Sequence, residues 1–114
     1  MQSKRNPLNL NSLQLKTLTL LQELARLVGA PAAGGDGGGV AIREFPHAHG
    51  DHFHLGDAMV AGRDATGLRN PSVWKALERK GLIRPQPPDA VILTELGQRY
   101  ETGLRDAILN RGEH

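Results

Sequence analysis

Four of the chain's five histidines lie within eight residues, from His47 to His54, in the order His-Ala-His-Gly-Asp-His-Phe-His. Neutral imidazoles bind zinc, nickel and copper, and carboxylates add oxygen ligands to such sites. The stretch therefore predicts a site for zinc, nickel or copper, although a chain of this length does not need a metal in order to fold. The candidate ligands are His47, His49, His52, His54 and Asp51.

Two other interpretations of the histidines stay open. Four imidazoles held close together resist carrying charge at the same time, so protonation near about pH 6 would make them a proton sensor. The stretch is also compatible with a surface hairpin whose histidines bind nothing, because side chains spread along two strands do not automatically converge on one ion.

A β-hairpin is the element expected to position the histidines. We predict that it spans residues 40–60 and turns at Gly50-Asp51, a two-residue loop whose first residue, a glycine, supplies a positive φ. All four imidazoles then project from one face, because directly paired residues share a face. The pairs are His49 with His52 and His47 with His54, and the opposite face carries Ile42, Ala48, Phe53, Leu55 and Met59.

The composition is that of one small domain of 114 residues without cysteine, which excludes disulfides, thiolate zinc sites and cysteine nucleophiles. No apolar run approaches the roughly 20 residues that span a bilayer, and residues 1–12 lack the apolar core of a secretory signal. We expect a cytoplasmic protein that does not enter membranes. It would have a flexible arm over residues 1–12, a single domain over 13–110 and a tail over 111–114.

The segment 29–39 holds six glycines and no side chain larger than aspartate or proline, so we predict a flexible connector. It lacks the Gly-Lys-Ser/Thr ending and the following helix that a phosphate-binding loop requires. We therefore do not assign nucleotide binding to it.

Leucines at helical spacing predict a long amphipathic helix over residues 13–28, with Asn11 and Gln14 as a capping box at its start. The leucines cover more than one face, because Leu15 and Leu18 lie partly off the main stripe. A second helix or a second subunit would have to cover the leucines that lie off this stripe. A homodimer through this helix and the C-terminal helix is one such arrangement.

The second half of the chain predicts a helix-turn-helix unit over residues 63–104. A short helical turn at 63–67 precedes a helix at 71–80, which begins with an N-cap at Asn70 followed by Pro71 and ends at Gly81. A proline-rich turn at 84–89, a strand at 90–93 and a final helix capped by Thr94 follow. The final helix carries Leu96, Tyr100, Leu104 and Ile108 at every fourth residue.

Positive charge is concentrated in the same unit. The whole chain has a net charge of +2, whereas the stretch from Arg63 to Arg84 holds six basic residues against two acidic ones. A local excess of this kind favours an anionic partner.

The order of these elements, with Leu-Glu-Arg-Lys-Gly-Leu-Ile at 77–83 and Leu-Thr-Glu-Leu-Gly-Gln-Arg-Tyr at 93–100, resembles the winged helix-turn-helix domain of bacterial transcription regulators of the MarR and PadR type. The resemblance implies an α+β fold, a winged helix-turn-helix with an additional β-hairpin between the first and second helices. It also implies a small regulator that binds double-stranded DNA, and the histidines would make it responsive to metal or pH. The DNA-binding residues implied are Arg69, Asn70, Ser72, Lys75 and Arg79 on the recognition helix, with Arg84 and Gln86 at the wing. The alternative function is a winged-helix module that binds proteins instead of DNA.

The histidine stretch also fits His-x-His-x-Asp-His, which resembles the metal motif of the metallo-β-lactamase superfamily. That fold needs a chain roughly twice as long and further ligands downstream, whereas no histidine occurs between His54 and His114. We therefore do not expect an enzyme.

Overall fold

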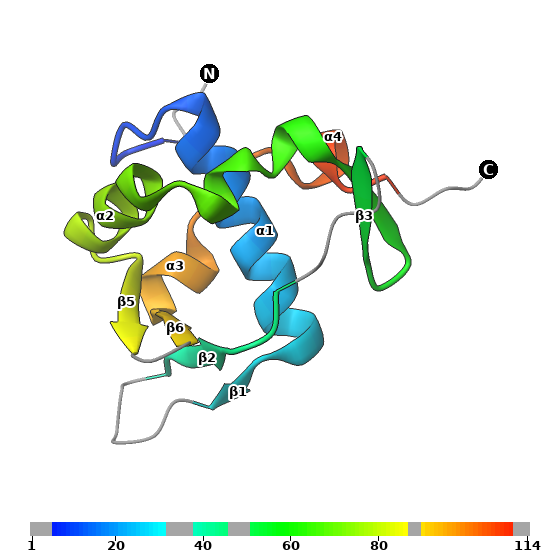
Figure 1. The fold of residues 1–114 in the computed structure, drawn as a ribbon. Helices are drawn as coiled ribbons and strands as arrows, with labels where there is room; N and C mark the ends of the chain where they lie inside the picture. Colours follow the sequence, from blue (N-terminus) through cyan, green and yellow to red (C-terminus); the bar gives the residue numbers. More distant parts are fainter. Residues whose placement is uncertain (1–5, 32–37, 46–50, 87–89, 111–114) are drawn as a thin grey trace.

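The computed structural model describes residues 6–31, 38–45, 51–86 and 90–110. Its longest element is helix α1 (Ser12–Val28), which runs down the centre of the molecule with the other elements around it (Figure 1). The predicted capping box is confirmed: Asn11 accepts a hydrogen bond from the Gln14 backbone, and the Gln14 side chain accepts one from the Asn11 backbone. These bonds satisfy backbone donors that a helix start otherwise leaves unpaired.

The surplus leucines of α1 are covered within this chain. Leu18, Leu20 and Leu21 are completely buried, and α1 touches helices and strands on several sides. A second subunit is therefore not needed to explain the leucine content of α1. The homodimer stays a prediction, and of the α1 leucines only Leu27 is exposed.

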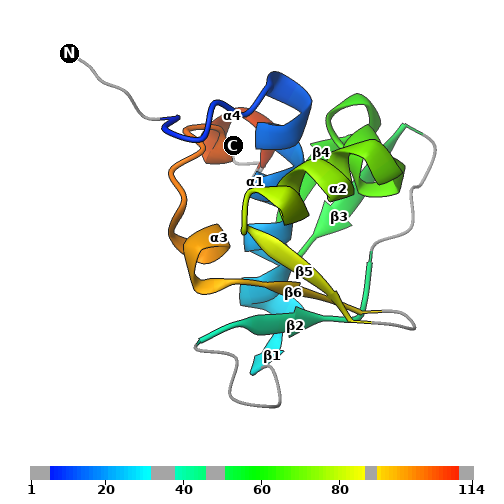
Figure 2. The same cartoon turned by 90° about the vertical axis from the view of Figure 1, so that its left-hand side faces the viewer.

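A four-stranded antiparallel sheet closes one end of the molecule, with strand order β1-β2-β6-β5 (Figure 2). The strands are β1 (Ala30–Pro31), β2 (Val40–Ile42), β5 (Ile83–Gln86) and β6 (Ala90–Leu93). Ile42, Ile83 and Leu93 belong to the core cluster that includes the leucines of α1. Ala30 and Pro31, which were predicted to lie in a flexible connector, therefore form a strand, because they pair with Ala41 and Val40.

Strand β5 corrects the prediction of a proline-rich turn beginning at Arg84. The chain stays extended to Gln86 and pairs with β6, with Pro85 opposite Val91. Proline is tolerated here because β5 is the last strand in the sheet order, where a missing N–H need not break a central ladder.

The hairpin predicted over residues 40–60 is wrong in its register. Strand β2 pairs with β6, and the hairpin is formed by β3 (His52–Leu55) and β4 (Ala58–Ala61), turning at Gly56-Asp57. Gly56 has a φ of +59°, as the first residue of such a turn requires. His52 therefore pairs with Ala61 and His54 with Met59, not with His49 and His47.

The physical reason for this register is burial. Phe53 lies opposite Val60 and Leu55 opposite Ala58, and all four side chains are buried against the core. The predicted turn at Gly50-Asp51 uses the same dipeptide, but it would take Val40 and Ile42 away from β6.

The segment predicted to be a helix-turn-helix unit begins directly after β4. It consists of two short 3-10 helices, η1 (Gly62–Asp64) and η2 (Thr66–Arg69), followed by α2 (Pro71–Arg79). Asn70 is the N-cap of α2 with Pro71 at its first turn, as predicted. Lys80 is the C-cap of α2, and Gly81 follows with a φ of +79°.

The single C-terminal helix that we predicted is divided in two, α3 (Glu95–Arg99) and α4 (Arg105–Ile108). Thr94 caps α3 as expected, by accepting from the Gly97 backbone. The helix ends because Tyr100 is extended, and Gly103 at φ +73° lies between the two helices. The Tyr100 hydroxyl donates to Asn6 and the Thr19 hydroxyl donates to Thr102, and these two bonds hold this non-helical path.

Residues 6–11, which we expected to belong to a loose arm, make tertiary contacts. The Tyr100 hydroxyl donates to Asn6 and accepts from the Leu8 backbone, while Leu10 is buried. The remainder of the predicted arm, residues 1–5, lies outside the described residues.

Contact between α1 and η2 supplies a test of the packing that positions the helix-turn-helix unit. A methyl group on Gly67 would lie 1.8 Å from Thr17 Oγ1 and 3.2 Å from Thr17 Cβ. We expect Gly67→Ala to lower the free energy of unfolding by about 2 kcal/mol or more, as overpacking does. Adding Thr17→Ala removes the obstructing hydroxyl and should restore at least about 1 kcal/mol of the loss, which urea unfolding of the four proteins in the cycle would measure.

Gly81→Ala is the matched control, because Gly81 has a positive φ but no atom within 4 Å of the added methyl. It should cost about 1 kcal/mol through backbone strain alone and show no coupling to Thr17→Ala. Equal coupling at both glycines would contradict the packing argument.

Candidate functional site

Helix α2 is fixed by its inner face. Val73, Ala76 and Leu77 are buried, and the Trp74 indole N–H donates to the Leu68 carbonyl at 3.0 Å. The Phe45 ring packs edge-on against Trp74, with 5.9 Å between ring centres. These contacts set the rotation of α2 about its axis and so determine which side chains face solvent.

The outer face of α2 carries Ser72, Lys75 and Arg79, all exposed. Positions separated by three and four residues lie on one side of a helix, so the three side chains form one stripe. Exposed Arg69 precedes the stripe at the end of η2. Glu78 is the only acidic residue of α2, and it lies beside this stripe.

Asn70 is the N-cap of the same helix. Its side-chain oxygen accepts from the Ser72 backbone N–H at 3.0 Å. Asn70 was predicted as a DNA-contacting residue, and the structure shows that its oxygen is occupied by the cap.

Lys80 differs from the other cations of the basic segment. Its ammonium donates to the Leu8 carbonyl at 2.6 Å, and the residue is only half-exposed. Lys80 therefore fastens the N-terminal segment to the C-terminal end of α2, and the exposed positive charge of the helix rests on Lys75 and Arg79.

Strand β5 lies beside α2, on the side of the molecule that faces the viewer in Figure 2. Arg84 and Gln86 alternate with Ile83 and Pro85 along β5, so they share the face of the sheet that turns away from the core. Arg84 is exposed and Gln86 is half-buried. Of the seven residues predicted for DNA contact, five therefore belong to the η2–α2 segment and two to the neighbouring strand.

The described part of the histidine stretch lies on the opposite side of α1 from α2 (Figure 1). His52 and His54 share the outer face of β3, with 5.2 Å between their ring centres and an angle of 84° between the rings. His52 Nδ1 lies 3.4 Å from an Asp51 carboxylate oxygen. His47 and His49 lie outside the described residues, and within the described part no three histidine, aspartate or glutamate side chains are placed to hold a metal ion.

Met59 is a neighbour of these histidines that our sequence reasoning assigned to the apolar face. It lies opposite His54 and is 44% exposed. The sequence signal for this position of Met59 is the second Gly-Asp dipeptide, Gly56-Asp57, which lies between His-Phe-His-Leu and Ala-Met-Val-Ala.

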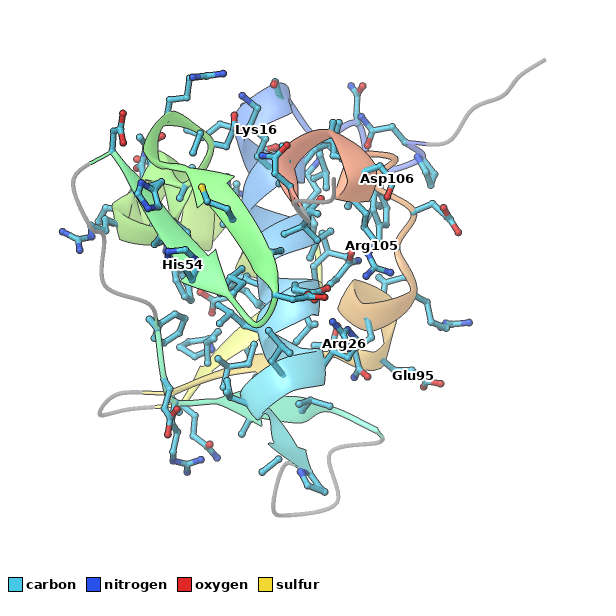
Figure 3. All side chains as sticks on the ribbon, turned by 90° about the vertical axis from the view of Figure 1, so that its right-hand side faces the viewer. Lys16, Arg26, His54, Glu95, Arg105 and Asp106 are labelled. Carbon is cyan, nitrogen blue, oxygen red and sulfur yellow. The ribbon has the colours of Figure 1, made fainter. Side chains whose placement is uncertain are left out.

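A pair of ion pairs around a buried glutamate, which the sequence did not predict, joins α1 to α4. Glu23 is 2% exposed and accepts hydrogen bonds from Arg26 and from Arg105, the latter at 3.1 Å. The hydrogen bond and the charge of Glu23 raise the pKa of Arg26. Figure 3 shows Arg26 and Arg105 on one side of the molecule. There they line a cavity of about 460 Å³, which is also lined by Arg99, Glu101 and Asp106. Charges of both signs line it, so it shows no selectivity for an anion or a cation.

No protein-family model, curated protein or solved structure matches this chain. The helices in the described ranges include none that is long and apolar enough to cross a membrane.

The cap at Asn70 leads to a prediction that separates stability from recognition. Asn70→Ala should lower the free energy of unfolding by about 1 kcal/mol, because the Ser72 backbone donor loses its partner. Asn70→Asp keeps an acceptor at a favourable helix N-terminus and should leave stability nearly unchanged. Thermal and urea unfolding measure both effects, and an equal loss in the two variants would contradict the capping role.

Proposed function

We propose that this protein is a small transcription regulator that binds double-stranded DNA through a winged-helix domain, with α2 as the recognition helix and β5–β6 as the wing. The observation that carries the proposal is the position of the exposed cations. Lys75 and Arg79 project from one face of α2, and Arg84 lies on the strand beside it.

The arrangement of helices and strands supports the proposed winged-helix domain. Apart from β1 and the β3–β4 hairpin, the chain runs in the order α1, β2, η1–η2, α2, β5, β6 and α3. This is the order that the resemblance to MarR and PadR regulators implies, with β5 in place of the expected proline turn. Strand β2 joins β5 and β6 in one sheet, so the proposed wing is anchored by a third strand. The β3–β4 hairpin is the additional element between the first and second helices.

The dimensions and chemistry of α2 suit the proposed role. A helix of nine residues is about 13 Å long and presents a cylinder that the major groove of B-DNA, about 12 Å wide, can admit. Lys75, Arg79 and Arg69 would neutralise phosphates and set the position of the helix. Ser72, at the exposed N-terminal end, would be the first side chain to reach base edges.

The hairpin gives the proposed regulator a place to sense a signal. Strand β4 leads directly into η1, and the Gly62 backbone N–H donates to the Asp51 carbonyl. A ligand or proton that changed the histidine face would therefore act at the first residue of the helix-turn-helix unit. Zinc or nickel binding by His47, His49, His52, His54 and Asp51 is one proposed signal of this kind, and protonation is the other.

Salt dependence of DNA binding tests the proposed surface. Each phosphate neutralised contributes about 0.9 to the slope of log K against log salt concentration. We expect Lys75→Gln with Arg79→Gln to lower that slope by roughly 2 and to weaken binding to all sequences alike. Fluorescence anisotropy of a labelled mixed-sequence duplex, titrated at several salt concentrations, measures both quantities.

Two controls isolate the position of the charge from its amount. Lys75→Arg with Arg79→Lys keeps the charge on α2 and should keep the slope. Arg99→Gln removes a charge beside the cavity that Arg26 and Arg105 line, and should change neither slope nor affinity. If the unmodified protein bound no duplex at about 50 mM salt, the DNA proposal would be refuted and the protein-binding alternative would take its place.

A further inference from the structure

We propose that His52, His54 and Met59 form a binding site for a soft monovalent metal ion, Cu(I), on the outer face of the β3–β4 hairpin. The site differs from the predicted zinc, nickel or copper site because Met59 is one of its ligands and because its metal is the monovalent ion Cu(I). It goes beyond the proposed DNA binding and does not depend on it, because the hairpin and α2 lie on opposite sides of α1 (Figure 1).

The two imidazoles already have the spacing that a shared metal requires. With metal–nitrogen bonds of about 2.1 Å, two imidazoles on one tetrahedral ion place their ring centres about 5.2 Å apart. The ring centres of His52 and His54 are 5.2 Å apart. The backbone of β3 therefore supplies the separation, and rotation about χ2, which is broad for histidine, would direct one nitrogen from each ring to a common point.

Met59 reaches the same place from the neighbouring strand. Residues next to a two-residue turn form a hydrogen-bonded pair, so Leu55 with Ala58 is such a pair and His54 with Met59 is the next, non-hydrogen-bonded one. Side chains of a non-hydrogen-bonded pair are the closer kind, with Cα atoms about 4.5 Å apart. The outward backbone groups of Met59 bond to Asn110 instead, at 2.7 and 3.0 Å, which holds this strand position from its other side.

A shallow hollow lies between Met59 and His52. His52 and Met59 both line a cavity of about 310 Å³, with Asp51, Arg63 and Asn110 at its border. His54 lies beside His52 on the same face (Figure 3). An Nδ1–H of His52 directed at Asp51, 3.4 Å away, would leave Nε2 as the metal ligand, which is the role of outer partners in histidine metal sites.

The ligand types select the metal. Thioethers are soft ligands that favour Cu(I), while zinc and nickel prefer further nitrogen, oxygen or thiolate ligands. The three proposed ligands are neutral, and the opposite charges of Asp51 and Arg63 at the hollow offset each other. The preference for Cu(I) therefore rests on the soft thioether and not on the local charge.

Binding of Ag(I), a redox-inert substitute for Cu(I), to the full chain gives the sharpest test. The chain has only two methionines, so protein labelled with ¹³C at the methionine methyl groups gives a signal for Met59 that Met59→Leu removes. We expect one equivalent of Ag(I) to shift the Met59 methyl signal. Competition against the chromophoric chelator bicinchoninate, under anaerobic reducing conditions, would then give the Cu(I) affinity.

Variants distinguish this site from one made by the other histidines. Met59→Leu should weaken Cu(I) binding at least about tenfold, because even the loss of a residue that only bonds to a metal ligand lowers metal affinity about tenfold or more. The same variant should leave any zinc or nickel binding nearly unchanged. His52→Gln with His54→Gln should abolish Cu(I) binding, whereas His47→Gln with His49→Gln should retain it. Circular dichroism confirms that each variant is folded. The proposal is overturned if Met59→Leu binds Cu(I) as tightly as the parent, or if binding is lost with His47 and His49 but kept without His52 and His54.

Discussion

The pairing of β2 with β6 is the constraint on which the rest of the structure depends. It places Val40 opposite Leu93 and Ile42 opposite Val91, and so joins two segments that are far apart in the sequence. The chain between β2 and β5 must therefore leave the sheet and return to it. The chain does so around α1: the hairpin lies on one side of that helix, and α2 with β5 lies on the other (Figure 1). The pairing thus separates the histidine face from the cationic face, although η1 and η2 connect the two within a few residues.

Elements defined by local signals were predictable from the sequence. Asn11 with Gln14, Asn70 with Pro71, and Thr94 each mark a helix start, because a cap needs only bonds between residues two or three apart. The hairpin was not predictable in the same way. Gly50-Asp51 and Gly56-Asp57 are equivalent local turn signals, and the choice between them rests on the long-range pairing of β2 and on the burial of Phe53 against the core.

The division between α3 and α4 has a similar origin. A four-residue apolar repeat predicts a continuous helix, and it contains no information about partners far away in the sequence. In the structure, Tyr100 and Thr102 bond to Asn6 and Thr19, and Gln22 donates to the carbonyls of Gly97 and Tyr100. The two bonds from Gln22 satisfy backbone carbonyls that a continuous helix would have paired internally. Tertiary contacts with α1 therefore decide the local conformation, as they commonly do when propensity is moderate.

The corrected hairpin register also changes the chemistry of the histidine face. His52 and His54 lie two residues apart in one strand, so they share a face whichever turn is used. With the turn at Gly56-Asp57, the residue opposite His54 is Met59 instead of another histidine. A face expected to offer four imidazoles and a carboxylate instead offers, in its described part, two imidazoles and a thioether. In the Cu(I) site that we propose, the preferred metal therefore differs from the borderline ions that imidazole and carboxylate share, because a thioether favours a soft ion.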